Sequence, residues 1–157
     1  MPDSHMLSAE DHLGIVDTLH RFAAGQDDRD TALFRSAFTD DAVLDFTQPA
    51  RRLGIDLPPF AGGDALAAAI MKATSELTTT HSVTNARIVG HGSSEAVLVA
   101  LVEAQHLSAT DHSRRLMLKN RFVATVVRHA GGWAIRRLVI ENIWRDGEAG
   151  VLFPQAG

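Results

Sequence analysis

The hydrophobic pattern of this chain changes its period at His81. Before this residue, apolar side chains recur every three to four positions, the spacing that gathers them on one face of a helix. After it, apolar and polar residues alternate, as they do along β-strands. Helical segments followed by a series of strands favour an α+β domain in which helices pack on one face of an antiparallel sheet.

Three helices are predicted before His81, over about 8–25, from Asp30 onward and over 64–77. Ser8 and Asp11 have the spacing of a capping box at the start of the first helix, and Gly25 is predicted to close it. A short strand over 42–46 precedes a segment rich in Pro and Gly over 47–62. Long loops in compact domains often serve as pocket lids.

The strands are unusually long. They are predicted over 81–90, 95–107, 116–128 and 133–144. Since strands usually have about 5–6 residues, a sheet built from these should coil strongly. Helices across the open face of a coiled sheet make a cone, and a cone encloses a mostly apolar cavity. The expected fold is therefore a cone with three N-terminal helices packed on a curved antiparallel sheet.

Composition narrows the class of protein. The 157 residues, 45% of them hydrophobic, fit one domain, predicted over 8–148 with terminal tails at 1–7 and 149–157. The net charge of −4, with scattered basic residues, argues against a nucleic-acid partner. No segment approaches the ~20 apolar residues of a membrane span, so no membrane partner is expected. The chain has no cysteine, which excludes thiolate chemistry and fits a reducing cytosol; a cytoplasmic location is expected.

No metal or other cofactor is expected. The eight histidines lack the short paired spacing of zinc or iron sites. No glycine-rich phosphate loop and no Gly-x-Ser-x-Gly elbow is present. The strands over 95–102 and 122–127 are apolar on both faces. Together they have more apolar surface than one cavity can bury. This surplus predicts a homodimer or homotrimer formed through the outer face of the sheet.

Two distant segments supply candidate catalytic groups. An acidic cluster, Asp27, Asp28 and Asp30, lies where the first helix ends, and His81 opens the first long strand. If a carboxylate and this imidazole meet in an apolar pocket, the carboxylate can orient the ring and the ring can move protons. Which of the three acids faces the pocket stays open. The alternative is an aspartate that only caps a turn and a histidine that packs in the core.

Several segments together resemble the SnoaL-like branch of the NTF2-like superfamily. They are 27–30 with 33–46, 80–85, 104–106, 120–122, 131–135 and 142–147. The resemblance spans about residues 8–148 and implies a cone fold. It says less about activity, because this fold carries isomerases, dehydratases, dehydrochlorinases, cyclases and non-catalytic members.

Two enzyme types of that branch, scytalone dehydratase and hexachlorocyclohexane dehydrochlorinase, use an Asp–His pair. The resemblance implies that Asp27 and His81 form this pair, and that His106 is a second pocket histidine acting as the acid; His106 as a core histidine stays open. The chain lacks the tyrosines of the dehydratase, since it has none at all. It also lacks the dehydrochlorinase lysine, because Arg21 is one register off. Both departures argue against those two substrates.

The sequence therefore predicts a cofactor-independent lyase or isomerase that acts by dehydration or proton shift on a small hydrophobic cyclic oxygenated metabolite. The residues predicted to contact this ligand are Asn120, Arg121, Trp144, Phe46 and Phe60. Asn120 and Arg121 could stabilise an oxyanion, whereas Trp133 is predicted to be structural. The alternative is a non-catalytic ligand-binding or structural module, as in the β subunits of ring-hydroxylating dioxygenases.

Overall fold

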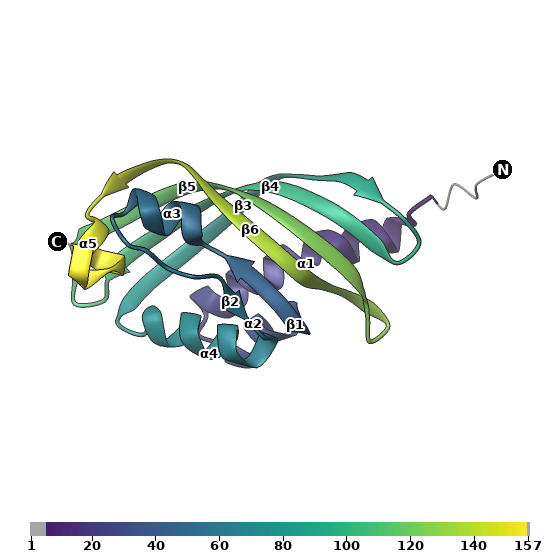
Figure 1. The fold of residues 1–157 in the computed structure, drawn as a ribbon, viewed down its shortest axis with the longest axis horizontal. Coiled ribbons are helices and arrows are strands. Elements are labelled where there is room, and N and C mark those ends of the chain that lie inside the picture. Colours follow the sequence, from purple (N-terminus) through teal and green to yellow (C-terminus); the bar gives the residue numbers. More distant parts are fainter. Residues whose placement is uncertain (1–5, 157) are drawn as a thin grey trace.

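One strongly curved sheet of six strands dominates the computed structural model, which describes residues 6–156 (Figure 1). The strand order is β2-β1-β6-β5-β4-β3, and β1 pairs parallel to β6 while every other pair is antiparallel. The strands are β1 (Phe38–Asp45), β2 (Phe60–Ala61), β3 (Leu77–His91), β4 (Glu95–Ser108), β5 (Asp111–His129) and β6 (Gly132–Gly147).

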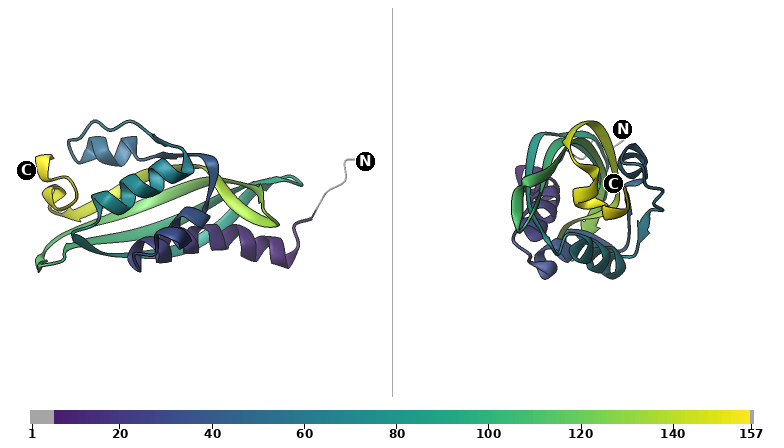
Figure 2. Two further views of the ribbon diagram at one scale, coloured as in Figure 1. Left: turned by 90° about the horizontal axis from the view of Figure 1, so that it is seen from below. Right: turned by 90° about the vertical axis from the view of Figure 1, so that its left-hand side faces the viewer.

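Helices lie on the concave side of this sheet and at one of its ends (Figure 1 and Figure 2). They are α1 (Ala9–Asp27), α2 (Thr31–Ser36), α3 (Thr47–Arg52), α4 (Gly63–Ala73) and α5 (Ala149–Leu152), followed by a 3₁₀ turn (Pro154–Ala156). Seen along the sheet, the strands curl around toward α1 and α4, and α5 lies at one end (Figure 2). The predicted α+β cone is confirmed.

The first helix starts as predicted but ends later. The Ser8 hydroxyl accepts from the Asp11 backbone N–H at 3.0 Å, and the Asp11 carboxylate accepts from the Ser8 N–H. Gly25 does not close the helix, which continues to Asp27. A Cβ at Gly25 would lie 2.3 Å from the backbone nitrogen of Phe34. Glycine is therefore required there by the close approach of α2, not by helix termination.

Two segments predicted to be irregular are ordered. The loop predicted over 47–62 contains α3 and the short strand β2, which pairs with β1. The tail predicted over 149–157 instead forms α5 and the 3₁₀ turn, and α5 contacts β4 and β5. Its apolar residues Val151 and Phe153 pack against the sheet and Phe46, which fixes the C-terminal segment over one end of the cone.

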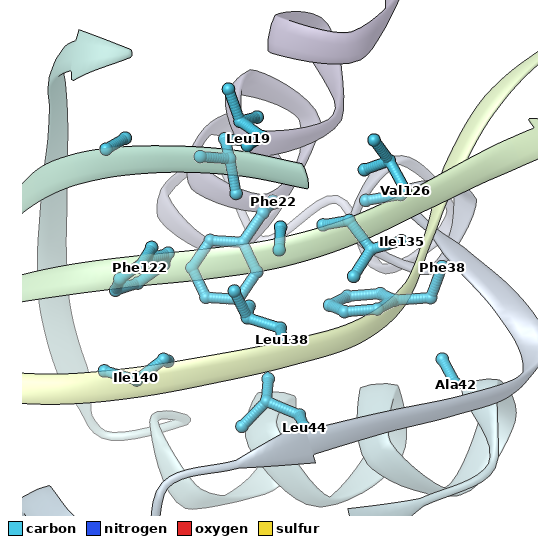
Figure 3. Close-up of a cluster of buried hydrophobic side chains, with 14 of the residues drawn as sticks. Leu19, Phe22, Phe38, Ala42, Leu44, Phe122, Val126, Ile135, Leu138 and Ile140 are labelled. Atoms are coloured by element: carbon cyan, nitrogen blue, oxygen red, sulfur yellow. The ribbon is translucent and has the colours of Figure 1, made fainter. Parts of the chain in front are cut away.

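The main core fills only part of the cone. Figure 3 shows apolar side chains from α1 and the strands meeting between them, among them Phe22, Phe38 and Phe122. The rings of Phe22 and Phe122 meet edge to face, with their centroids 5.4 Å apart. Beyond this contact, toward α5, the cone stays open.

Candidate active site

The open part of the cone is a cavity of about 280 Å³. Its wall is mostly apolar and comes from α1, α4, the concave face of the sheet and the C-terminal segment. The polar residues on this wall are Gln26, Thr74, His81, His106 and Asn120. Small-molecule sites generally have this character: an apolar concavity with a few placed polar groups.

Asp27 hydrogen-bonds to His81, which lines this cavity. Asp27 is the last residue of α1, and His81 points inward from β3. The ring Nδ1 of His81 lies 2.6 Å from Asp27 Oδ1, and the His81 backbone N–H donates to Asp27 Oδ2 at 2.7 Å. The Thr79 hydroxyl also donates to Oδ1, at 3.0 Å. Since a carboxylate only accepts, Nδ1 carries a proton toward Asp27, and Nε2 is the ring nitrogen left for the cavity.

The environment keeps Asp27 ionised at neutral pH. Burial raises the pKa of this carboxyl, but the hydrogen bonds and charge of His81, together with the Thr79 hydroxyl, outweigh it and leave the pKa below its usual value. The His81 side chain is only 4% exposed, and its ring packs edge to face on Phe22 at 5.8 Å. The carboxylate and the aromatic ring together fix the orientation of the imidazole.

His106 lies beside His81 on the neighbouring strand. The two rings meet edge to face with centroids 6.0 Å apart. His106 Nδ1 donates to the Leu116 carbonyl at 3.2 Å, which directs Nε2 away from that carbonyl. Burial, followed by the proximity of His81, lowers the pKa of His106 to about 4. This ring is therefore neutral near pH 7, and the predicted role of a protonated acid does not fit its surroundings.

Asn120 is held in one orientation by a second asparagine. The side-chain N–H of Asn142 donates to Asn120 Oδ1 at 2.9 Å, so the Asn120 amide is left to donate toward the cavity. Gln48 of α3 holds the Asn142 backbone by accepting from its N–H at 2.7 Å. A bulge at this point pairs Asn120 with Asn142 and Lys119 with Trp144, so Ile143 is unpaired.

Three of the five residues predicted to contact the ligand lie on the cavity wall: Asn120, Phe46 and Phe60. Arg121 and Trp144 do not. Arg121 follows the inward-facing Asn120, so strand alternation turns it outward to pair with Glu141 at 3.6 Å. Trp144 follows the bulge and is 52% exposed.

The structure also distinguishes the three aspartates of the acidic cluster. Asp30 caps α2 by accepting from the Leu33 N–H at 2.9 Å, and Asp28 is exposed, so Asp27 is the acid that binds the wall histidine His81. Arg21 binds Asp17 and backbone carbonyls near α2 and β6, away from the cavity wall. Trp133 is buried, and its indole N–H donates to Asp11 at 3.1 Å, which fits the structural role predicted for it.

Sequence reasoning missed several wall residues. Phe22 and Gln26 come from α1, one turn apart on the same face, and Leu152 and Phe153 come from the C-terminal segment. The i, i+4 spacing to Phe22 was the available signal for Gln26. Nothing local marks Leu152 or Phe153, because their position depends on how the chain end folds back.

Within residues 6–156, no group of three or more His, Asp and Glu side chains is arranged to hold a metal ion. In that same part of the chain, no helix combines the length and apolar character that crossing a bilayer requires.

The chain belongs to the SnoaL-like domain family, whose model matches residues 7–139. This confirms the resemblance to the SnoaL-like branch of the NTF2-like superfamily. A curated relative is "Terrestric acid biosynthesis cluster protein E" of Penicillium crustosum, 25% identical over 154 residues, which cover 94% of this chain and 93% of that protein.

Three solved structures have a similar fold. A putative aromatic ring hydroxylase from Novosphingobium aromaticivorans is 21% identical, with a TM-score of 0.81 over 94% of this chain and 99% of that one. A putative scytalone dehydratase from the same species is 18% identical, with a TM-score of 0.74 over 87% and 86%. A hexachlorocyclohexane dehydrochlorinase is 19% identical, with a TM-score of 0.70 over 88% and 89%. These likenesses establish the fold.

Proposed function

We propose that this protein is a cofactor-independent lyase or isomerase in which the Asp27–His81 pair moves a proton on a small, hydrophobic, cyclic oxygenated metabolite. The observation that carries the proposal is the hydrogen bond of 2.6 Å between Asp27 and His81 Nδ1 at the wall of an apolar cavity. A neutral imidazole near pH 7 is suited to remove a proton from carbon next to a carbonyl.

The carboxylate contributes in two ways. It holds the proton on Nδ1, so Nε2 is the basic atom that meets the ligand. It also stabilises the imidazolium that forms when Nε2 takes the proton, and this attraction is stronger in an apolar cavity than in water. Positioned acid–base groups of this kind typically accelerate a reaction by about 10²–10⁴-fold.

In a dehydration, His81 performs both proton transfers. Nε2 removes the proton from the carbon beside the carbonyl, and the electron pair of that C–H bond forms the new C=C bond as the C–O bond to the hydroxyl breaks. The imidazolium then gives the same proton to the departing oxygen, so that water leaves. Because one base serves both proton transfers, the proton that is removed and the hydroxyl that leaves must lie on the same face of the ring. The reaction is therefore a syn elimination. His106 and Asn120 have hydrogen-bonding roles: His106 Nε2 accepts from the hydroxyl, and the Asn120 amide donates to the oxygen that gains charge.

The relatives favour the same class of substrate. The curated relative is named for the biosynthesis of terrestric acid, and one solved structure is called a putative scytalone dehydratase. Both names point toward metabolite chemistry. Scytalone itself fits poorly, since this chain has no tyrosine to hold a substrate carbonyl.

A non-catalytic binding module is the second candidate. The mostly apolar cavity would serve ligand binding without chemistry equally well, which favours this alternative. However, a partly buried carboxylate–imidazole pair beside an apolar cavity is costly to desolvate, and acid–base chemistry makes use of such a pair. Catalysis is therefore the better-supported of the two hypotheses.

The test uses 3-hydroxy-1-tetralone, a bicyclic β-hydroxyketone that loses water to give 1-naphthol, which is followed by its absorbance. The wild-type protein is expected to accelerate this loss, and His81→Ala to remove the acceleration while leaving the circular dichroism spectrum unchanged. A matched control is His91→Ala, because His91 is an exposed histidine of the same strand. Equal rates for wild type and His81→Ala would reject the proposal.

A further inference from the structure

Gln26 is a buried polar residue on the wall of the cavity. It is 4% exposed, and its side chain makes no hydrogen bond within the part of the chain that the structure describes. In that part, Asn142 Oδ1 is the one fully enclosed side-chain polar atom that lacks a partner, so the Gln26 carboxamide still touches the cavity. Buried carboxamides are rarely left unpaired, because their desolvation is costly unless a hydrogen bond replaces the water.

The fold places Gln26 across the cavity from Asn120. Gln26 lies one helical turn beyond Phe22, and Asn120 lies two strand positions from Phe122 on the same face. The rings of Phe22 and Phe122 touch, with centroids 5.4 Å apart. The two amides therefore lie beyond this aromatic contact, one on the helix wall and the other on the sheet wall.

The direction of the chain puts both amides on the same side of that contact. The C-terminal end of α1 bonds to β3 at Thr79 and His81. Across the sheet, these two positions of β3 lead through β4 to 116–118 of β5. Moving from Phe22 to Gln26 along α1 thus runs parallel to moving from Phe122 to Asn120 along β5, toward the open cavity.

The wall carries no counter-charge for an anionic ligand. None of the residues that line the cavity is Lys or Arg, and besides the histidines its hydrogen-bonding groups are the Gln26 and Asn120 amides and the Thr74 hydroxyl. A carboxylate or phosphate would lose its hydration there without gaining an ionic partner. An uncharged ring with oxygens at two separate edges matches both amides.

We propose that Gln26 is a specificity-determining residue, whose carboxamide binds a neutral carbonyl or hydroxyl oxygen of an uncharged cyclic ligand while Asn120 binds a second oxygen from the opposite wall. This assignment names the substrate class of the proposed function and depends on that function only for the cavity as the ligand site. It predicts that oxygens at two edges of the ligand, rather than its apolar area alone, determine the affinity.

The test compares two probes by calorimetry. They are 6-hydroxy-1-tetralone, with oxygens at two edges of the bicycle, and tetralin, the same bicycle without oxygen. The wild type is expected to bind the hydroxyketone more tightly than tetralin. Gln26→Leu should weaken the binding of the hydroxyketone by about tenfold, since one net hydrogen bond is lost. The binding of tetralin should be unchanged or tighter. Gln26→Met, unbranched like Gln, serves if the Leu variant does not fold.

The matched control is Ile70→Leu, an apolar exchange on the α4 wall of the cavity that should shift both probes by the same factor. Two outcomes would overturn the assignment: no preference of the wild type for the hydroxyketone, or the same factor for both probes in the Gln26 variants. Turnover that depends on His81 reports on the proposed function separately. If turnover is absent but binding depends on Gln26, the proposed function fails and the assignment of Gln26 stands.

Discussion

The carboxylate of Asp27 binds His81 twice, through the ring Nδ1 at 2.6 Å and through the backbone N–H at 2.7 Å. The second bond fixes the strand position from which the imidazole projects, so helix end and strand start are joined at one point. The Thr79 hydroxyl adds a third donor to the same carboxylate. The contact between α1 and β3 therefore fixes the orientation of the imidazole.

Replacing the carboxylate should impair turnover far more than folding. In Asp27→Asn, the amide retains one acceptor oxygen but no charge, so it neither stabilises the imidazolium nor enforces the correct tautomer. We expect the rate of 1-naphthol formation to fall by about 10²–10⁴-fold. Steady-state kinetics check this loss. Asp28→Asn changes an exposed neighbour and should keep the wild-type rate; similar losses in both variants would contradict the assignment of Asp27.

The buried, neutral His106 should make the fold sensitive to acid. Its pKa is about 4 in the folded protein, against 6.5 for an ordinary histidine. Because the unfolded chain takes up this proton at higher pH, the stability is complete above pH ~6.5 and is lost as the pH falls toward 4. We expect His106 to account for a loss of about 3 kcal/mol between pH 7 and 4.

Urea unfolding at a series of pH values measures this loss. His106→Gln, which does not titrate, should show a smaller fall in unfolding free energy over the same interval. Carboxylates with lowered pKa, among them Asp27 and Asp45, remain in both proteins, so the difference between the two curves isolates the histidine. Superimposable pH dependences would show that His106 is not buried in its neutral form.

Gly25 should not tolerate a side chain. Since a Cβ would lie 2.3 Å from the Phe34 backbone nitrogen, Gly25→Ala must push α2 away from α1. We expect a loss of about 1–3 kcal/mol in unfolding free energy, even though alanine favours a helix. Gly92→Ala, where no atom lies within 4 Å of the added Cβ, serves as control. An unchanged or increased stability of Gly25→Ala would refute the close approach.

We propose that the outer face of the sheet joins copies of this chain. Three valines, Val99, Val123 and Val139, are paired in a row across β4, β5 and β6 on that face, and each is partly exposed. Light scattering should give two or three times the chain mass, and Val123→Glu should give the monomer. Ser82→Glu, a change on the exposed edge strand, should keep the oligomer. A monomeric wild type at micromolar concentration would contradict the proposal.

Much of this fold could be predicted from the sequence, because the spacing of apolar residues along a helix or strand is a local property. The change of period predicted at His81 lies four residues inside β3, close to the boundary between helices and long strands, and the Ser8–Asp11 pair marks where α1 begins. Asp27 and His81 could be paired only through the family resemblance, since their contact depends on how α1 crosses the sheet. The end of α1 was misplaced because Gly25 serves interhelical packing, which a one-dimensional pattern cannot distinguish from termination.

Other parts of the site depend on geometry that no local pattern encodes. Asn120 and Arg121 are adjacent, and neighbouring side chains of a strand point to opposite faces, so only one of them can face the cavity. Which of them does depends on which face of the whole strand is buried. Trp144 points outward because of the bulge at Ile143. Glutamine is typical of the exposed surface of a helix. Only the packing of Phe22 against the sheet reveals that Gln26, one turn later, faces the cavity.

The central claim is that Nε2 of His81, oriented by Asp27, removes the proton from the ligand. The most direct measurement is the rate of 1-naphthol formation from 3-hydroxy-1-tetralone by wild type and by His81→Ala under the same conditions. We expect a wild-type rate at least about 10²-fold above that of the variant. Equal rates, in a variant that keeps the wild-type circular dichroism spectrum, would contradict it.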